Sequence, residues 1–85
     1  MAAELSQVVA EANLARDLEE RIKRACVEDL INHGLPVAIS LSRSYSVGVV
    51  ADAVARFRGR NVSQGVKVRI ENCVVAQTLV IHLTW

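Results

Sequence analysis

Six basic residues fall in one part of this 85-residue sequence, at spacings that suit contacts with phosphate groups. Three arginines surround the expected end of a helix, two cations alternate on the strand expected next, and one arginine stands in a polar turn. They are Arg43, Arg56, Arg58, Arg60, Lys67 and Arg69. Binding through such cations weakens as the salt concentration rises. The alternative is a solvated rim whose arginines stabilise the end of a helix.

The charge distribution favours a polyanionic partner for the C-terminal part of the chain. The formal net charge is only +1, but residues 1–33 hold seven acidic and four basic residues. Residues 34–85 hold two acidic and six basic residues, which gives this part a net charge of +4. Tyr45 lies near Arg43 in the polar turn, where its ring would either stack on a base or pack over the start of a helix.

The residues that often carry catalysis or bind metals form no recognisable motif here. His33 and His82 fit a helix end and a strand, and no metal-binding pattern surrounds them. Cys26 and Cys73 lie far apart in the sequence, so we interpret both as small buried hydrophobic residues. The serines resemble caps and turn residues, and no glycine-rich phosphate loop occurs. We therefore expect no enzyme, no metal, no cofactor and no small-molecule substrate.

Length and composition predict one small domain over residues 1–85. Hydrophobic residues make up 52% of the chain, which is enough for a core and argues against disorder. The longest apolar stretches are far shorter than the roughly 18 residues of a membrane span. The N-terminal residues lack the basic start and apolar run of a secretory signal. We expect a cytoplasmic protein without a membrane partner, with nucleoid or nuclear association as an alternative.

An amphipathic helix is predicted from the apolar residues that recur every four positions from Leu14 to Leu30. Asn13 is a candidate N-cap, and Gly34 is placed to end the helix in a left-handed conformation. Residues 1–12 have three interpretations: an N-terminal arm, an extension of the helix or a short strand. The apolar surplus of an extended helix would dock on a partner or remain in solvent.

A second helix and three strands are predicted after residue 34. The helix covers residues 47–57, with Ser44 or Ser46 as its cap and Gly59 after its end. The strands show alternating apolar and polar residues. Their ranges are 35–42, 66–71 and 78–85.

Together these elements predict an α/β fold, a two-layer sandwich whose mixed sheet is covered on one face by two helices. A right-handed crossover through the second helix makes the first two strands parallel, and the last strand is antiparallel. The second helix is apolar over more surface than one small core requires. Val49, Ala53 and Phe57 are therefore expected at a homodimer interface.

The sequence resembles the Alba superfamily over roughly residues 12–85. The resemblance rests on the segment Leu30-Ile31-Asn32-His33-Gly34, the strand and Arg-containing turn up to Val47, and the helix from Ala51 to Phe57. Residues 66–75 and 78–83 resemble the two C-terminal strands of that family. The resemblance implies an Alba-like dimer that binds DNA or RNA and is not an enzyme, with Arg43 close to the nucleic-acid-facing side.

Two functions follow as hypotheses. In the first, the dimer binds RNA or DNA with low sequence specificity through the six cations, and Tyr45 supplies any stacking. In the second, the chain keeps the fold but serves as a protein–protein interaction or assembly module. The second hypothesis rests on two features, because residues 8–14 contain no Lys or Arg and the connection from Val74 to Gln77 is short and uncharged.

Overall fold

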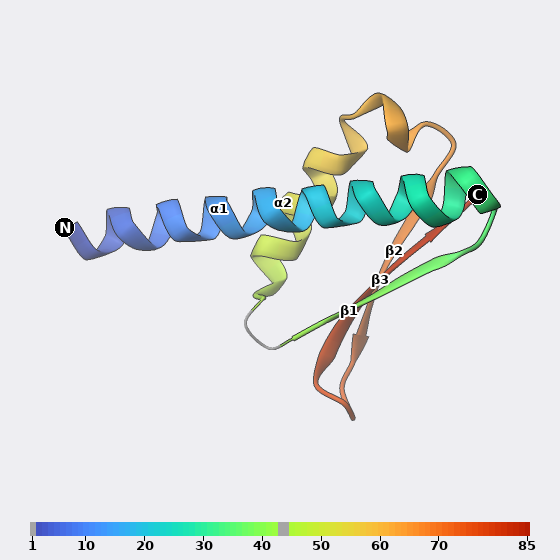
Figure 1. The fold of residues 1–85 in the computed structure, drawn as a ribbon. Coiled ribbons are helices and arrows are strands. Elements are labelled where there is room, and N and C mark those ends of the chain that lie inside the picture. The colour runs from blue at the N-terminus through green and yellow to red at the C-terminus, as the bar shows by residue number, and fades with distance from the viewer. Residues whose placement is uncertain (1, 43–44) are drawn as a thin grey trace.

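A computed structural model of the protein describes residues 2–42 and 45–85, with side chains from residue 10 onward. The elements follow the predicted order of helix, strand, helix, strand and strand. Helices α1 (Ala2–Ala25) and α2 (Val47–Arg58) pack against each other in one layer, and three strands form the other (Figure 1). The expected two-layer α/β sandwich is therefore confirmed.

The first helix is longer than its apolar pattern predicts. It begins at Ala2 and runs without a break through Asn13, which is therefore not an N-cap. The predicted helix extension is confirmed for residues 2–12, and the alternative prediction of a short strand is wrong. Alanine and glutamate favour a helix in this stretch. The N-terminal turns of α1 extend past α2 (Figure 1). Among the described residues, neither helix combines the length and the apolar character needed to cross a bilayer.

The C-terminal end of this helix is wound more widely than an α-helix. Cys26–Ile31 form a π-helical segment, η1, in which Cys26 and Leu30 are buried. Apolar residues at every fourth position rotate gradually off the core in a helix of 3.6 residues per turn. The wider winding of η1 keeps the last two of them on the buried side. Leu14, at the other end of the pattern, is 36% exposed.

The helix ends at Gly34, as predicted. Gly34 has φ +68°, a left-handed conformation that glycine adopts without strain. Its N–H donates to the carbonyl oxygen of Leu30 at 2.9 Å, and the N–H of Leu35 donates to that of Asp29 at 3.1 Å. These bonds satisfy two carbonyl groups at the end of the helix, and the chain then turns into the first strand.

The three strands are β1 (Val37–Leu41), β2 (Lys67–Cys73) and β3 (Thr78–Thr84), and their order in the sheet is β1-β3-β2. β1 and β2 run in the same direction, as the crossover predicts, but β3 lies between them. Both ladders are antiparallel, so the prediction of a mixed sheet is wrong. The crossover rule fixes the relative direction of two strands and does not tell whether a third strand enters between them.

One face of the sheet is covered by the helices, and coverage decreases from β1 toward β2. Along β1, buried residues alternate with exposed ones. Ile39 of β1 lies opposite Ile81 of β3, and both are buried. Ile70 of β2 also lies opposite Ile81 but is 40% exposed. The core therefore sits under β1 and β3, and β2 forms a partly open edge.

The start of α2 agrees with the prediction, whereas its expected role in dimer formation does not. The Ser46 hydroxyl accepts a hydrogen bond from the N–H of Val49 at 3.2 Å, and the other candidate cap, Ser44, lies outside the described residues. Val49, Ala53 and Phe57 are 5%, 0% and 0% exposed within a single chain. The prediction that they form a dimer interface is wrong, because the long α1 packs along α2 and the surplus apolar surface is buried inside one chain.

Candidate nucleic-acid interface

Three of the predicted cations meet at the outer edge of β2. Lys67 and Arg69 are exposed and share the face of the sheet away from the helices, as predicted, at about 6.6 Å along the strand. Val68 lies between them and packs against the core. Its carbonyl oxygen accepts a hydrogen bond from Nη2 of Arg58 at 3.3 Å. We refer to Arg58, Lys67 and Arg69 as the edge cations.

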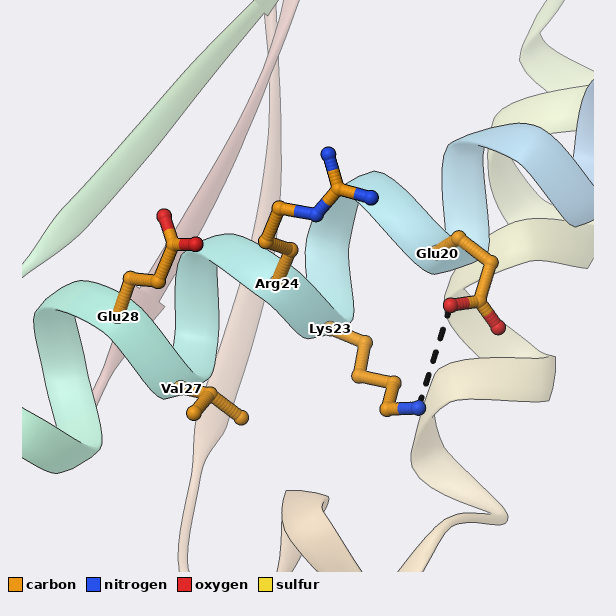
Figure 2. A pocket seen from close by; sticks show the side chains of 5 residues that line it. All are labelled: Glu20, Lys23, Arg24, Val27 and Glu28. Atoms are coloured by element: carbon orange, nitrogen blue, oxygen red, sulfur yellow. Dashed lines mark ion pairs between the residues drawn. The ribbon is translucent and has the colours of Figure 1, made fainter.

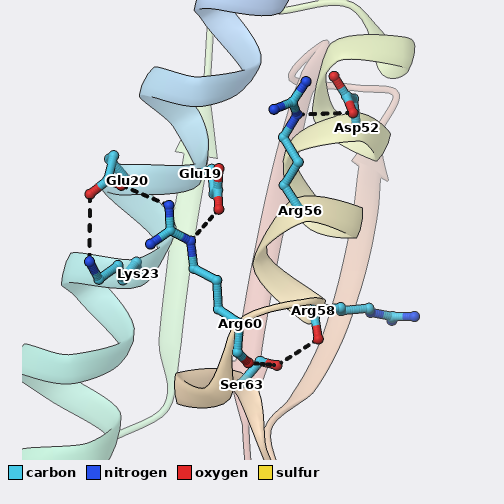
Figure 3. A network of polar contacts seen from close by, with 8 residues as sticks. All are labelled: Glu19, Glu20, Lys23, Asp52, Arg56, Arg58, Arg60 and Ser63. Atoms are coloured by element: carbon cyan, nitrogen blue, oxygen red, sulfur yellow. Dashed lines mark hydrogen bonds and ion pairs between the residues drawn. The ribbon is translucent and has the colours of Figure 1, made fainter.

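The edge cations face solvent. All three are exposed, and none takes part in the ion pairs found among residues 2–42 and 45–85. In Figure 3 the side chain of Arg58 extends away from the other labelled charged side chains. The charges of the edge cations are therefore available to an external anion. The hydrogen bond from Arg58 to the carbonyl oxygen of Val68 limits the movement of its guanidinium group.

An acid and a histidine lie beside Arg69 on the face of the sheet away from the helices, which we call the open face. Oε1 of Glu71 lies 3.0 Å from Nε2 of His82. The hydrogen bond with His82 lowers the pKa of Glu71, and the charges of His82 and Arg69 lower it further. Glu71 therefore stays ionised to lower pH than an isolated glutamate and offsets part of the positive charge of this face.

Arg60 belongs to the helical layer instead. Its Nε donates to Oε2 of Glu19, and its Nη2 donates to Oε1 of Glu20 at 3.0 Å (Figure 3). Glu19 is only 7% exposed, and its hydrogen bond is the main cause of the raised pKa of Arg60. A buried carboxylate is unfavourable without such a partner. Arg60 therefore connects the turn after α2 to α1.

Arg56 also has an acidic partner. Its Nε donates to Oδ1 of Asp52 at 3.2 Å, one helical turn earlier on α2 (Figure 3). Both side chains are exposed, so the pair contributes little to stability. The five described cations of the predicted patch of six thus divide into two groups. Arg56 and Arg60 are neutralised by acids of the helices, and the edge cations are not.

The remaining two predicted site residues belong to the polar turn after β1. Arg43 lies outside the described residues. Tyr45 is half-buried, and its ring packs against the hydrophobic core. Of the two roles considered for Tyr45, the structure supports packing at the start of α2.

A shallow hollow lies on the outer surface of α1 and η1 (Figure 2). Its lining consists of two acids, two bases and one apolar side chain, all from one stretch of helix. These residues are Glu20, Lys23, Arg24, Val27 and Glu28. Lys23 and Glu20 form an ion pair across it at 3.9 Å. The balanced charges are those of a solvated helix surface, and Arg24 projects there away from the strands.

The chain was compared with protein-family models, curated proteins and solved structures, and none of them matches. The candidate site is therefore defined by its own geometry.

The sequence pattern did not identify the acidic residues that pair with Arg60. Glu19 and Glu20 stand about 40 positions before Arg60, and only the fold brings them together. The sequence does contain one indirect signal, because its N-terminal part is acidic and its C-terminal part is basic. Part of the charge complementarity between the two parts of the chain is therefore satisfied within the molecule, by the pairs of Arg60 with Glu19 and Glu20.

Proposed function

We propose that this protein binds RNA or DNA with low sequence specificity, through phosphate contacts made by the edge cations. The observation that carries this proposal is that Arg58, Lys67 and Arg69 gather at one exposed edge and form no ion pair among the described residues. The resemblance of the sequence to the Alba superfamily supports the same function and implies a dimer. Arg43, which lies outside the described residues, stays in the proposal only on the basis of that resemblance.

The chemistry of the edge explains why specificity would be low. Arginine and lysine side chains neutralise phosphates, and contacts to phosphates carry no direct information about sequence. On the open face, His82 and Val80 of β3 lie next to β2, and Ala38 and Ser40 of β1 lie beyond them; the described residues of this face include no Phe, Tyr or Trp, and the His82 ring contacts Glu71. Base stacking as on an open RNA-binding sheet therefore has no platform there. The proposal accordingly gives Tyr45 a packing role.

Fluorescence anisotropy of labelled duplex DNA and single-stranded RNA, titrated with protein at several salt concentrations, tests the proposal. Three phosphate contacts on duplex DNA predict a log–log salt slope of about −2.7 for each protomer. Arg58→Glu should weaken binding strongly. Arg24→Glu is the matched control, because it makes the same change in charge on the outer surface of α1. Equal effects of the two variants, or no binding at low salt, would refute the proposed site.

An assembly function is the second candidate, and one observation favours it. The turn between β2 and β3 exposes two apolar side chains, Val74 at 76% and Val75 at 97%. Neighbouring exposed valines at the tip of a hairpin suit insertion into a partner protein. If Val75→Ser abolishes capture of a partner while nucleic-acid binding is absent from the wild-type protein, the assembly function replaces the first proposal.

A further inference from the structure

The two edges of the sheet differ in how they are protected. The β2 edge carries three charged side chains, those of Lys67, Arg69 and Glu71. In addition, Arg58 donates a hydrogen bond to the backbone carbonyl oxygen of Val68. Charges of this kind prevent an exposed edge from pairing with another strand. At the β1 edge, the strand Val37–Leu41 contains no charged residue. Exposed edge strands without charges readily accept another strand.

The backbone of β1 has unused hydrogen-bonding groups. Its ladder partner is β3, and no other backbone partner of Val37–Leu41 occurs among the described residues. In a ladder, the N–H and C=O groups of every second residue point toward the same side. About half of the groups of β1 therefore point outward, away from β3, and are available to a further strand.

We propose that β1 pairs with β1 of a second copy of this chain, antiparallel and about a two-fold axis at Ile39. The hydrogen bond of Arg58 at the β2 edge favours this partner. Pairing of two β2 edges would have to displace Arg58 in both copies, and pairing of β1 with β2 of another copy would have to displace it in one and would not close. Pairing of β1 with itself meets neither obstacle and forms a closed dimer.

Hydrogen-bond geometry and full overlap of the two five-residue strands together determine the register of this pair. The N–H and C=O groups that point away from β3 belong to every second residue of β1. A residue with outward groups must therefore lie opposite a residue with outward groups in the second copy. Ile39 then faces Ile39 of the second copy, and Ala38 faces its Ser40. Opposite residues of an antiparallel pair lie on the same face, so the faces that pack against the helices in the two copies join into one face of the combined sheet. The result is a six-stranded sheet with all four helices on one face.

In this dimer the two sets of edge cations lie at a defined distance from each other. The consequence for nucleic-acid binding rests on the proposed function. The two β2 edges become the outermost strands, separated by five strand spacings or about 24 Å. Each carries one set of edge cations. A nucleic acid long enough to reach both edges would bind with the advantage of two linked sites.

Two charge variants test the dimer by themselves, without nucleic acid. Ala38→Lys/Ser40→Lys places like charges opposite each other across the two-fold axis, and it should yield a monomer. Ala38→Glu/Ser40→Lys alters the same two exposed positions but places opposite charges across the axis, so it should remain a dimer. Circular dichroism confirms that each variant is folded.

Sedimentation equilibrium across the micromolar range measures the outcome, because a five-residue ladder is a small interface. We expect the wild-type protein and the Glu/Lys variant to reach twice the 9.3 kDa mass of one chain, and the Lys/Lys variant to stay at that mass. A monomeric wild-type protein would overturn the proposal, and so would a Lys/Lys variant that dimerises like the wild type.

Hydrogen exchange of the wild-type protein gives a second test that requires no variant. The outward N–H groups of β1 should exchange more slowly as protein concentration rises, while those at the outer edge of β2 should not change. Concentration-independent exchange at β1 would overturn the proposal. Either result leaves the anisotropy test of the edge cations unaffected, because that test concerns the opposite edge of the sheet.

Discussion

Arg58 and Arg60 stand two residues apart in the chain but belong to different regions of the molecule. Arg60 lies in the helical layer, where a nearly buried Glu19 and an exposed Glu20 neutralise it. Arg58 lies at the sheet edge beside Lys67, where the only described partner of its guanidinium group is a backbone carbonyl group. A neutralised arginine holds elements of the fold together, whereas an unpaired one is available to an external anion. The spacing of basic residues alone does not separate these two roles.

The largest effect is expected from breaking the neutralised region. Glu19→Ala removes a nearly buried hydrogen bond between charged groups and should lower the free energy of unfolding by about 2 kcal/mol. Urea denaturation measures the change. Glu20→Ala is the control, because Glu20 is exposed and its loss should change stability by about 0.5 kcal/mol or less. Equal effects of the two variants would contradict the distinct role of Glu19.

Neutralising the edge should affect binding rather than stability. Lys67→Gln/Arg69→Gln removes two of the proposed phosphate contacts, so the log–log salt slope on duplex DNA should become shallower by about 1.8. Affinity at low salt should fall about tenfold, and the urea midpoint should stay near that of the wild type. A variant that loses stability but keeps the wild-type slope would place these residues with the structural arginines.

A smaller effect is expected from Arg56. Arg56→Ala removes an exposed pair with Asp52 on the same helix, so stability should fall by only about 0.3–0.5 kcal/mol. Nucleic-acid affinity should change less than it does for Arg58→Ala, which removes the same charge at the edge. Anisotropy at one low salt concentration compares the two variants directly. A larger loss with Arg56→Ala would shift the proposed site onto α2.

The smallest expected effect concerns the acid on the open face. The pKa of Glu71 is lower in the folded protein because of its hydrogen bond with His82, so ionised Glu71 favours the folded state. This contribution is present at neutral pH and is lost as the pH falls below about 4.5 through the lowered pKa. His82→Ala should raise the titration midpoint of the Glu71 carboxyl carbon, measured by NMR. An unchanged midpoint would exclude the hydrogen bond as its cause.

Much of the fold could be predicted because local signals agree with the tertiary structure. The alternation in β1, the hydroxyl of Ser46 and the freedom of Gly34 each determine structure within a few residues. The order of the strands could not be predicted in the same way, because it depends on where β3 inserts. The flank of α2 around Ala53 was expected to face a second copy, because the length of α1 that packs along it depends on tertiary structure and not on a local pattern.

The candidate site was predictable only in part. The position of Lys67 and Arg69 follows from the alternation of β2, which a sequence displays directly. The neutralisation of Arg60 depends on Glu19, about 40 residues away, and on the burial of that carboxylate. No local pattern contains this information, because the angle at which α1 crosses the turn after α2 decides which charges meet.

The central strand of the sheet, β3, is also the last of the three described strands in sequence order. Residue 37 pairs with residue 83, so β1 is synthesised long before its only described neighbour, and β2 likewise waits for β3. Until then neither strand has a ladder partner within the chain, and contacts this distant in sequence form slowly. During synthesis the nascent chain therefore exposes two unpaired strands, and any premature stop before Thr78 would leave them without the strand that joins them.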